Sequence, residues 1–246
     1  MKTKCAQTRY PRASRHTRFG IFDAGRLCLL AVCLTATAAG QEQSDDAQKD
    51  TTHILGVVPS HGVTNDKNAV PLTASGKFRL FTASATDPFA LMGVGLQAAV
   101  SQAKNEFPDY GQGASGYGKR FGSSYLDFAI SSFMTGYAFP VLLREDPRYF
   151  REGSGSFRKR LSHSLASSFV TRTDAGGSRF NYSNTLGAIT AGAISNAYYP
   201  SSDRGVGLVF SRAAISIAIG TAGAVFAEFG PDIGKKLSRK AKKKGP

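Results

Sequence analysis

The chain is organised around the run Phe107-Pro-Asp-Tyr-Gly-Gln-Gly-Ala-Ser-Gly-Tyr-Gly-Lys-Arg-Phe-Gly122, in which glycine, aromatic and charged residues are densest. The apolar segment 125–143 follows it, and then Glu145-Asp-Pro-Arg-Tyr-Phe-Arg151. Aromatic and aliphatic residues recur at helical spacing and cover more than half of the helix circumference, which is typical of a helix buried on most of its sides. The pattern predicts a central helix over 119–139 that Pro140 ends or kinks.

Helical patterns also lie on both sides of this segment. Thr73 and Asp87-Pro88 are helix-start signals, because their side-chain oxygens accept from free N–H groups and proline fits the first helical position. Gly230-Pro231 is a helix-stop signal. The predicted helices run over 73–83, 88–107, 119–139, 157–169, 186–198 and 203–229. We therefore expect a mainly α-helical single domain of five or six helices with Gly-rich connections, over residues 71–234.

The net charge of +14 is unevenly distributed along the 246 residues. Residues 1–40 carry seven basic residues and one acidic residue, and 235–246 carry seven basic residues and no acidic one. The intervening part, 41–234, has a net charge of +1. A nearly neutral body argues against a basic nucleic-acid-binding face on the folded domain.

The first 40 residues resemble an export signal. A long basic segment precedes the short apolar run 27–39, and Ala36-Thr-Ala38 is a cleavage pattern. All three cysteines lie within this signal, and His163 is the one histidine of the expected domain. The sequence therefore predicts no disulfide framework, no metal site and no cofactor. Residues 41–70 have the composition of a disordered linker.

The glycine-rich run contains two near-matches to nucleotide-binding motifs. Gly111 to Gly116 reads G-x-G-x-x-G, and Gly113 to Lys119 reads G-x-x-x-x-G-K. Both lack their context, because a helix rather than a strand precedes them and Arg120 stands where a Ser or Thr would bind magnesium. We expect no nucleotide. Two interpretations stay open: a tight helix connection, or an anion-binding site for a head group or sugar acid. The candidate anion-binding residues are Gly116, Gly118, Lys119 and Arg120.

Asp127 is the one acid of the predicted central helix, and a buried carboxylate needs a basic partner. Arg144, Arg148 and Arg151 are candidate partners in a structural ion pair. The alternative is a perturbed catalytic carboxylate. The weak catalytic candidates are then Asp127, Arg148 and Tyr149, with Lys119 and Arg120 beside them. Such a site requires these side chains to converge on one open pocket.

The end of the chain combines an apolar helix with a basic tail. Residues 213–227 are uncharged, and fifteen such residues fall short of a membrane span, so we favour a soluble core helix over a span. The tail 235–246 is either a solvated extension or a membrane-surface segment that binds anionic lipid or envelope polysaccharide. Its basic residues are Lys235, Lys236, Arg239, Lys240, Lys242, Lys243 and Lys244.

Four motifs together resemble an uncharacterised family of exported proteins from acidobacterial-type bacteria. The motifs are 111–122, Glu145-Asp-Pro-Arg-Tyr-Phe150, Thr171-Arg-Thr-Asp174 and Ile194-Ser-Asn-Ala-Tyr-Tyr-Pro200. The resemblance covers about residues 70–234. It implies export and a bacterial source, and it implies no catalytic residue, because the family has no established activity.

The sequence thus favours an exported, envelope-associated helical protein with a structural or interaction role, peripheral to the membrane and more a non-enzyme than an enzyme. Periplasm or outer envelope is the expected location, and assembly into a homo-oligomer is an open alternative. Two other hypotheses remain: an enzyme that acts on an anionic envelope substrate, and a small multi-span membrane protein.

Overall fold

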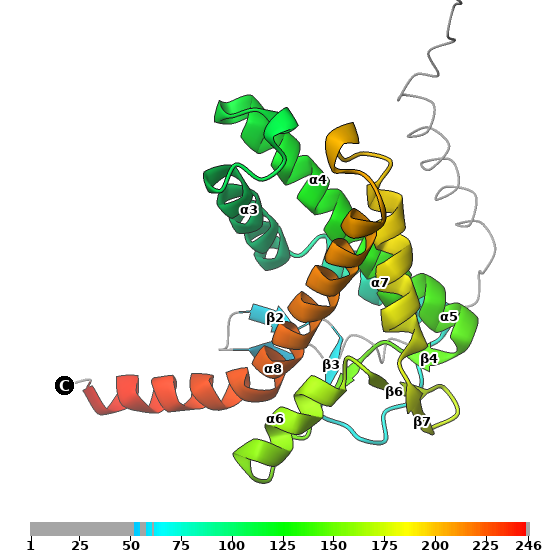
Figure 1. Cartoon of the computed structure of the whole chain (residues 1–246). Helices are drawn as coiled ribbons and strands as arrows, with labels where there is room; N and C mark the ends of the chain where they lie inside the picture. The colour runs from blue at the N-terminus through cyan, green and yellow to red at the C-terminus, as the bar shows by residue number, and fades with distance from the viewer. Residues whose placement is uncertain (1–51, 55–57, 61, 245–246) are drawn as a thin grey trace, which may run out of the picture. The chain divides into compact units, whose positions relative to one another are not determined.

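The computed structural model describes residues 52–54, 58–60 and 62–244 (Figure 1). The predicted export signal and the first part of the predicted linker lie outside these residues. The α-helices are α2 (Ala74–Ala85), α3 (Pro88–Ala103), α4 (Gly113–Phe133), α5 (Phe139–Leu143), α6 (Phe157–Ala166), α7 (Tyr182–Ser195) and α8 (Val206–Lys244). Because a π-helical segment joins α4 to α5, the described part holds six continuous helices. The prediction of a mainly helical fold is confirmed.

The helix starts at α2 and α3 follow from their capping residues. The Thr73 hydroxyl accepts a hydrogen bond from the Gly76 amide at 3.2 Å. The Asp87 carboxylate accepts one from the Phe89 amide at 3.0 Å, and Pro88 occupies the first position of α3. Each cap satisfies an amide that has no partner within its own helix.

The central helix is longer than the sequence pattern predicts. It begins at Gly113, continues as α4, and passes through the π-helical segment η3 (Met134–Ala138) into α5. Pro140 was expected to end or kink it, but it lies near the start of α5, just after the π-helical segment that changes the hydrogen-bond spacing. The helix ends instead at Arg144, whose φ of 56° is left-handed.

Helices α7 and α8 pack at close range, as the small residues of α7 lead one to expect (Figure 1). A Cβ atom on Gly192 would lie 2.3 Å from the Val209 carbonyl oxygen of α8, so this contact requires glycine. The Gly230-Pro231 stop signal is wrong, because α8 continues to Lys244 with Pro231 inside it. Figure 1 shows α8 bending in its C-terminal part, as a helix does where proline removes a hydrogen bond. The basic tail therefore prolongs a helix.

Short strands tie the connections together. β1 (Thr52–Ile54) pairs antiparallel with β2 (Val58–Ser60), and β4 (Glu145–Asp146), β6 (Val170–Thr173) and β7 (Ser178–Phe180) form an antiparallel sheet. β3 (Val63–Thr64) pairs in parallel with β5 (Tyr149–Phe150). Val63 and Thr64 fall in the predicted linker but are buried, so the ordered domain begins before Pro71. Backbone pairing with β5 orders this segment, which composition did not indicate.

The distribution of side chains is inverted relative to an ordinary globular core. The largest fully buried side chains include Arg120, Lys77, Glu145 and Glu228, whereas the buried apolar ones are mostly alanine and valine. Long charged side chains are almost never fully buried unless they are paired. Many large apolar side chains, by contrast, are exposed on the helices. Examples are Met92 (69%), Leu96 (68%), Leu142 (74%) and Phe210 (58%).

Candidate functional site

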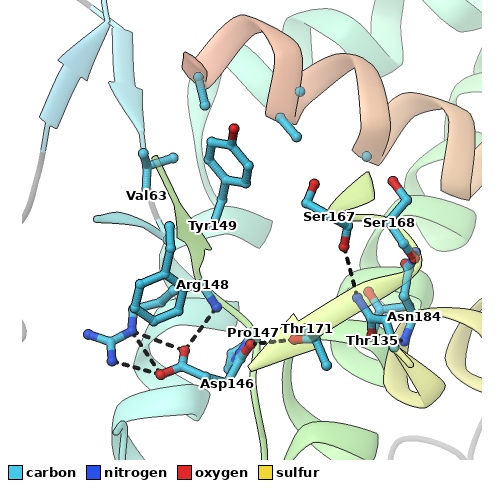
Figure 2. A pocket seen from close by; sticks show the side chains of 18 of the residues that line it. Val63, Thr135, Asp146, Pro147, Arg148, Tyr149, Ser167, Ser168, Thr171 and Asn184 are labelled. Atoms are coloured by element: carbon cyan, nitrogen blue, oxygen red, sulfur yellow. Dashed lines mark hydrogen bonds and ion pairs between the residues drawn. The ribbon is translucent and has the colours of Figure 1, made fainter. Parts of the chain in front are cut away.

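A cleft of about 840 Å³ opens between the strands and the helices, within the size range of small-molecule sites. The strand pair β3–β5, the end of α6, the start of α7 and the middle of α8 line it. Figure 2 shows Thr135, Ser167, Ser168 and Asn184 gathered on one side and Arg148 with Asp146 on the other, with Tyr149 between them.

Hydroxyl and amide groups build the first side of the cleft. The Ser167 hydroxyl donates to the Ser164 carbonyl oxygen at 2.7 Å, and the Thr135 hydroxyl donates to the Ser131 carbonyl oxygen at 2.9 Å. The Asn184 amide donates to the Ser168 carbonyl oxygen at 2.9 Å. The bond from Asn184 joins the start of α7 to the end of α6, whereas the other two lie within one helical turn. This side carries no formal charge.

The opposite side is an ion pair on a turn between β4 and β5. The Arg148 guanidinium donates to both carboxylate oxygens of Asp146, at 3.0 Å from Nε and 2.7 Å from Nη2. It also donates to the Val70 carbonyl oxygen at 2.6 Å, which ties the segment before α2 to this turn. Arg148, one of the predicted catalytic candidates, therefore holds the β4–β5 turn and the segment before α2 together.

Tyr149 connects the cleft to a buried carboxylate on α8. Its hydroxyl donates to Glu228 Oε2 at 2.8 Å, and Arg160 Nε donates to Glu228 Oε1 at 2.7 Å. The amides of Glu152 and Gly153 also donate to this carboxylate, each at 2.9 Å. Burial, followed by the hydrogen bond to Glu228, raises the pKa of Tyr149 well above its ordinary value. Tyr149 therefore stays a neutral donor at physiological pH.

Asp127 lies elsewhere, between α4, α7 and α8. It accepts hydrogen bonds from the hydroxyls of Ser195 (2.7 Å), Tyr198 (2.6 Å) and Tyr199 (2.6 Å). Its basic partner is Arg212, 3.5 Å away. The expected partners are therefore wrong: Arg148 pairs with Asp146, Arg151 with Asp232, and Arg144 is exposed. Burial and then the Asp127 charge raise the pKa of both tyrosines, so both stay neutral hydrogen-bond donors to Asp127 at physiological pH.

The glycine-rich run is a tight helix connection. The Arg120 side chain is 1% exposed and donates to the carbonyl oxygens of Glu106 (2.7 Å) and Gly111 (2.6 Å) and to Gln102 Oε1 (2.7 Å). A Cβ on Gly116 would lie 2.3 Å from the Gly111 oxygen. The anion-binding interpretation of Arg120 and Gly116 is therefore corrected, since both are used inside the connection. Lys119 and Gly118 are exposed beside it.

The catalytic candidates do not converge. Arg148 and Tyr149 line the cleft, but Asp127, Lys119 and Arg120 do not. Asp127 is paired with Arg212, and Arg120 donates to the Glu106 carbonyl oxygen inside the helix connection. In the tail, Lys235 and Lys236 are exposed on α8, and the side chains of the other basic residues lie outside the described ones.

Sequence reasoning missed three of the residues that matter most here. Glu228 and Arg212 flank the uncharged run 213–227 and are the charges that join α8 to its neighbours. Ser183 lies two residues after Asn181, which caps α7, and its side chain lines the cleft. A charge placed near each end of an otherwise uncharged helix is the one signal that pointed to the first two.

Comparison of the chain with protein-family models, curated proteins and solved structures gives no match. The resemblance to exported acidobacterial-type proteins thus stays a prediction. The function has to be argued from the geometry described above.

Proposed function

We propose that the chain is a small integral protein of the bacterial cell envelope, with a structural or interaction role, whose helices α4–α5 and α8 contact lipid. The observation that carries this proposal is the inverted distribution of side chains on α8. A soluble helix turns its apolar side inward and its polar side to water. In a bilayer, ionisable and polar side chains turn toward the bundle interior instead.

On α8 the polar side chains face protein partners. Arg212 pairs with Asp127, and the Ser216 hydroxyl bonds the Ser131 hydroxyl of α4. Further along, the Thr221 hydroxyl bonds Ser168 at 2.5 Å, and Glu228 binds Tyr149 and Arg160. Several large apolar residues of α8 are left outside, although Leu208 is buried. They include Phe210 (58% exposed), Ile215 (39%), Ile219 (56%) and Phe226 (43%).

The stretch α4–α5 has the same character. The buried side chains of α4 are polar, namely Arg120, Ser123, Ser124 and Ser131, and α5 buries Pro140. Leu126 and Leu142 are 43% and 74% exposed. The prediction that this helix is buried on most of its sides does not hold, because only 11% of its apolar window is buried.

Length and exposure support the same proposal. The stretches Gly113–Leu143 and Val206–Lys236 each contain 31 residues and are apolar enough to cross a membrane. At 1.5 Å per residue each is about 46 Å long, more than the roughly 30 Å of a hydrocarbon core. Only 11% of the most apolar window of each stretch is buried. A soluble core helix passes the same test of length and composition, but it is mostly buried.

The basic end of α8 fits this arrangement. Lys235 and Lys236 are the last two residues of the stretch Val206–Lys236 and are exposed. Lysine at the end of a spanning helix reaches the anionic head groups of the lipid. The tail then contributes to orientation, whereas the apolar helices hold the protein in the membrane.

Cell fractionation tests the proposal. The full chain and a version truncated after Gly234 are each washed with high salt, then with alkaline carbonate, and then with detergent. We expect both to stay in the membrane until detergent is added. Release of the full chain by salt, with loss of membrane association on truncation, would contradict the proposal and support a peripheral protein held by its tail.

A further inference from the structure

We propose that the cleft beside Tyr149 is a binding site for a neutral, polyhydroxylated molecule such as a sugar unit. The inference rests on the polar groups inside the cleft and not on the outer faces of the helices, although Thr135 and Ala224 of the two apolar stretches are among the residues that line it. Of the catalytic candidates only Arg148 and Tyr149 line this cleft, so the proposal concerns binding and not a reaction.

One buried polar group that lines the cleft has no hydrogen-bond partner among the described residues. The Ser183 side chain is 2% exposed, lines the cleft, and its hydroxyl has no hydrogen-bond partner among the residues that the structure describes. Its amide is already used, since it donates to Glu145 Oε2 at 2.9 Å. A buried hydroxyl left unpaired is unfavourable by about 1–3 kcal/mol, so such groups are normally satisfied. A ligand in the cleft would supply the missing partner.

The hydroxyl groups of three other residues that line the cleft can accept hydrogen bonds but have no proton left to donate. Thr135, Ser167 and Thr171 each donate their hydroxyl proton to a carbonyl oxygen of the protein, those of Ser131, Ser164 and Asp146. What each hydroxyl oxygen still offers is acceptor capacity. The wall therefore favours a ligand that donates several hydrogen bonds from closely spaced O–H groups.

Three carboxylates at the cleft are already paired with a basic residue. Glu145 pairs with Arg179 at 2.8 Å, Asp146 with Arg148 at 2.7 Å, and Glu152 with Lys67 at 2.9 Å. Asp87, which caps α3, and Arg172, which donates to the Lys67 carbonyl oxygen, also line the cleft. A charged ligand would have to break the three pairs or bind at Asp87 or Arg172, whereas a neutral polyol disturbs none of the pairs. The volume of about 840 Å³ leaves room for more than one sugar ring.

Saturation-transfer NMR on the purified full chain tests this inference. The protein is kept in a polyoxyethylene detergent, because a maltoside would itself present sugar hydroxyls. The probes are glucose and N-acetylglucosamine at millimolar concentration, with inorganic phosphate and tetramethylammonium as charged comparators in competition. We expect saturation of the protein to transfer to the ring protons of the neutral sugars, and we expect neither ion to displace them.

Two matched variants localise the binding. Ser183→Ala removes the unpaired hydroxyl from the cleft and weakens sugar binding about fivefold, the usual effect of one lost hydrogen bond. Thr185→Val is the control, because Thr185 also carries a buried unpaired hydroxyl on α7 but does not line the cleft. Both variants should fold, since each removes an unsatisfied hydroxyl and neither introduces a larger side chain.

Three outcomes would overturn the inference. They are no transfer to either sugar, displacement of the sugars by phosphate or tetramethylammonium, and an equal loss of binding in both variants. The second outcome would mean a site for a charged group. The third would mean that sugar binds elsewhere or that the variants act through the fold.

Discussion

Asp127 of α4 and Arg212 of α8 form an ion pair 3.5 Å apart that joins the two described helical stretches that are long and apolar enough to cross a membrane. Both side chains are almost covered, at 15% and 12% exposed. The Arg212 guanidinium lies between the rings of Phe107 and Tyr199, 5.1 and 4.8 Å from their centres. The attachment of α8 therefore depends on a charge pair in apolar surroundings.

Asp127→Ala should lower the free energy of unfolding by about 3 kcal/mol, because it leaves Arg212 buried without its counter-ion. The double variant Asp127→Ala/Arg212→Met should recover part of this loss, since it removes both charges. Thermal unfolding in detergent measures both. Lys67→Ala is the control, because its pair with Glu152 is at the surface and should matter little. Equal losses in the single and double variants would contradict a coupled pair.

Glu228→Ala should also destabilise strongly, by about 3 kcal/mol, because Arg160 and Tyr149 lose the carboxylate that both of them bind. Glu228 is 0% exposed. Asp232→Ala is the comparison: Asp232 pairs with the same Arg160 but is 36% exposed, so its loss should be clearly smaller. A larger effect at Asp232 would mean that Arg160 depends more on Asp232 than on Glu228.

Two glycine substitutions should have opposite signs. Gly192→Ala places a Cβ 2.3 Å from the Val209 carbonyl oxygen, so α8 must move and we expect a loss of about 2 kcal/mol. Gly118→Ala on α4 meets no atom within 4 Å, and it should raise stability by roughly 0.5 kcal/mol because alanine favours the helix. Denaturant unfolding measures the free energy of unfolding of each variant against that of the unmodified chain. A neutral Gly192→Ala would argue against tight packing of α7 on α8.

Ile219→Lys separates a lipid-facing helix from a soluble one. Ile219 is 56% exposed, and a lysine at an exposed position of a soluble protein usually changes stability by less than about 0.5 kcal/mol. At the centre of a membrane helix the same charge is unfavourable by roughly 2.5–3.5 kcal/mol. We expect the carbonate-resistant fraction to fall sharply.

Val70→Lys is the control for this experiment. Val70 is 81% exposed and lies in the segment between β3 and α2, outside both long apolar stretches. The Val70→Lys variant should keep the same carbonate-resistant membrane fraction as the unmodified chain. If Ile219→Lys and Val70→Lys gave the same membrane fraction, α8 would not face lipid.

Alkaline pH should weaken the fold through Tyr149. Its pKa is raised by burial and by the hydrogen bond to Glu228, whereas in the unfolded chain a tyrosine ionises near pH 10. The folded state thus keeps a proton that the unfolded state loses, and this contribution is complete below about pH 10 and lost as pH rises above it. Unfolding at pH 8 and pH 11 should show a smaller alkaline loss in Tyr149→Phe. Equal losses would contradict this assignment.

The helices were largely predictable, because their signals are local. Thr73 and Asp87 cap α2 and α3 through atoms two or three residues away, and neighbouring amides need no distant partner. Gly230-Pro231 failed as a stop signal for the opposite reason. α8 is held on both sides of Pro231 by the contacts of Glu228 and Asp232, which outweigh the local preference.

The candidate site was only partly predictable. Arg148 and Tyr149 were singled out and do line the cleft, because the charged turn that carries them is visible in the sequence. Their partners were not predictable. Asp127 meets Arg212, and Tyr149 meets Glu228, at separations of about 80 residues that no spacing rule connects.

By itself the sequence determined that the chain is mainly helical, where α2, α3 and α6 begin, and that its body is nearly neutral with a basic end. These properties depend on local hydrogen bonds and on composition. The tertiary structure alone decided which side of each helix is covered. Ser131, Asp127, Arg212 and Glu228 turn inward because each finds a partner on another element, and many large apolar side chains are left outside. Helical periodicity separates a polar side from an apolar one, but it does not say which of the two meets protein.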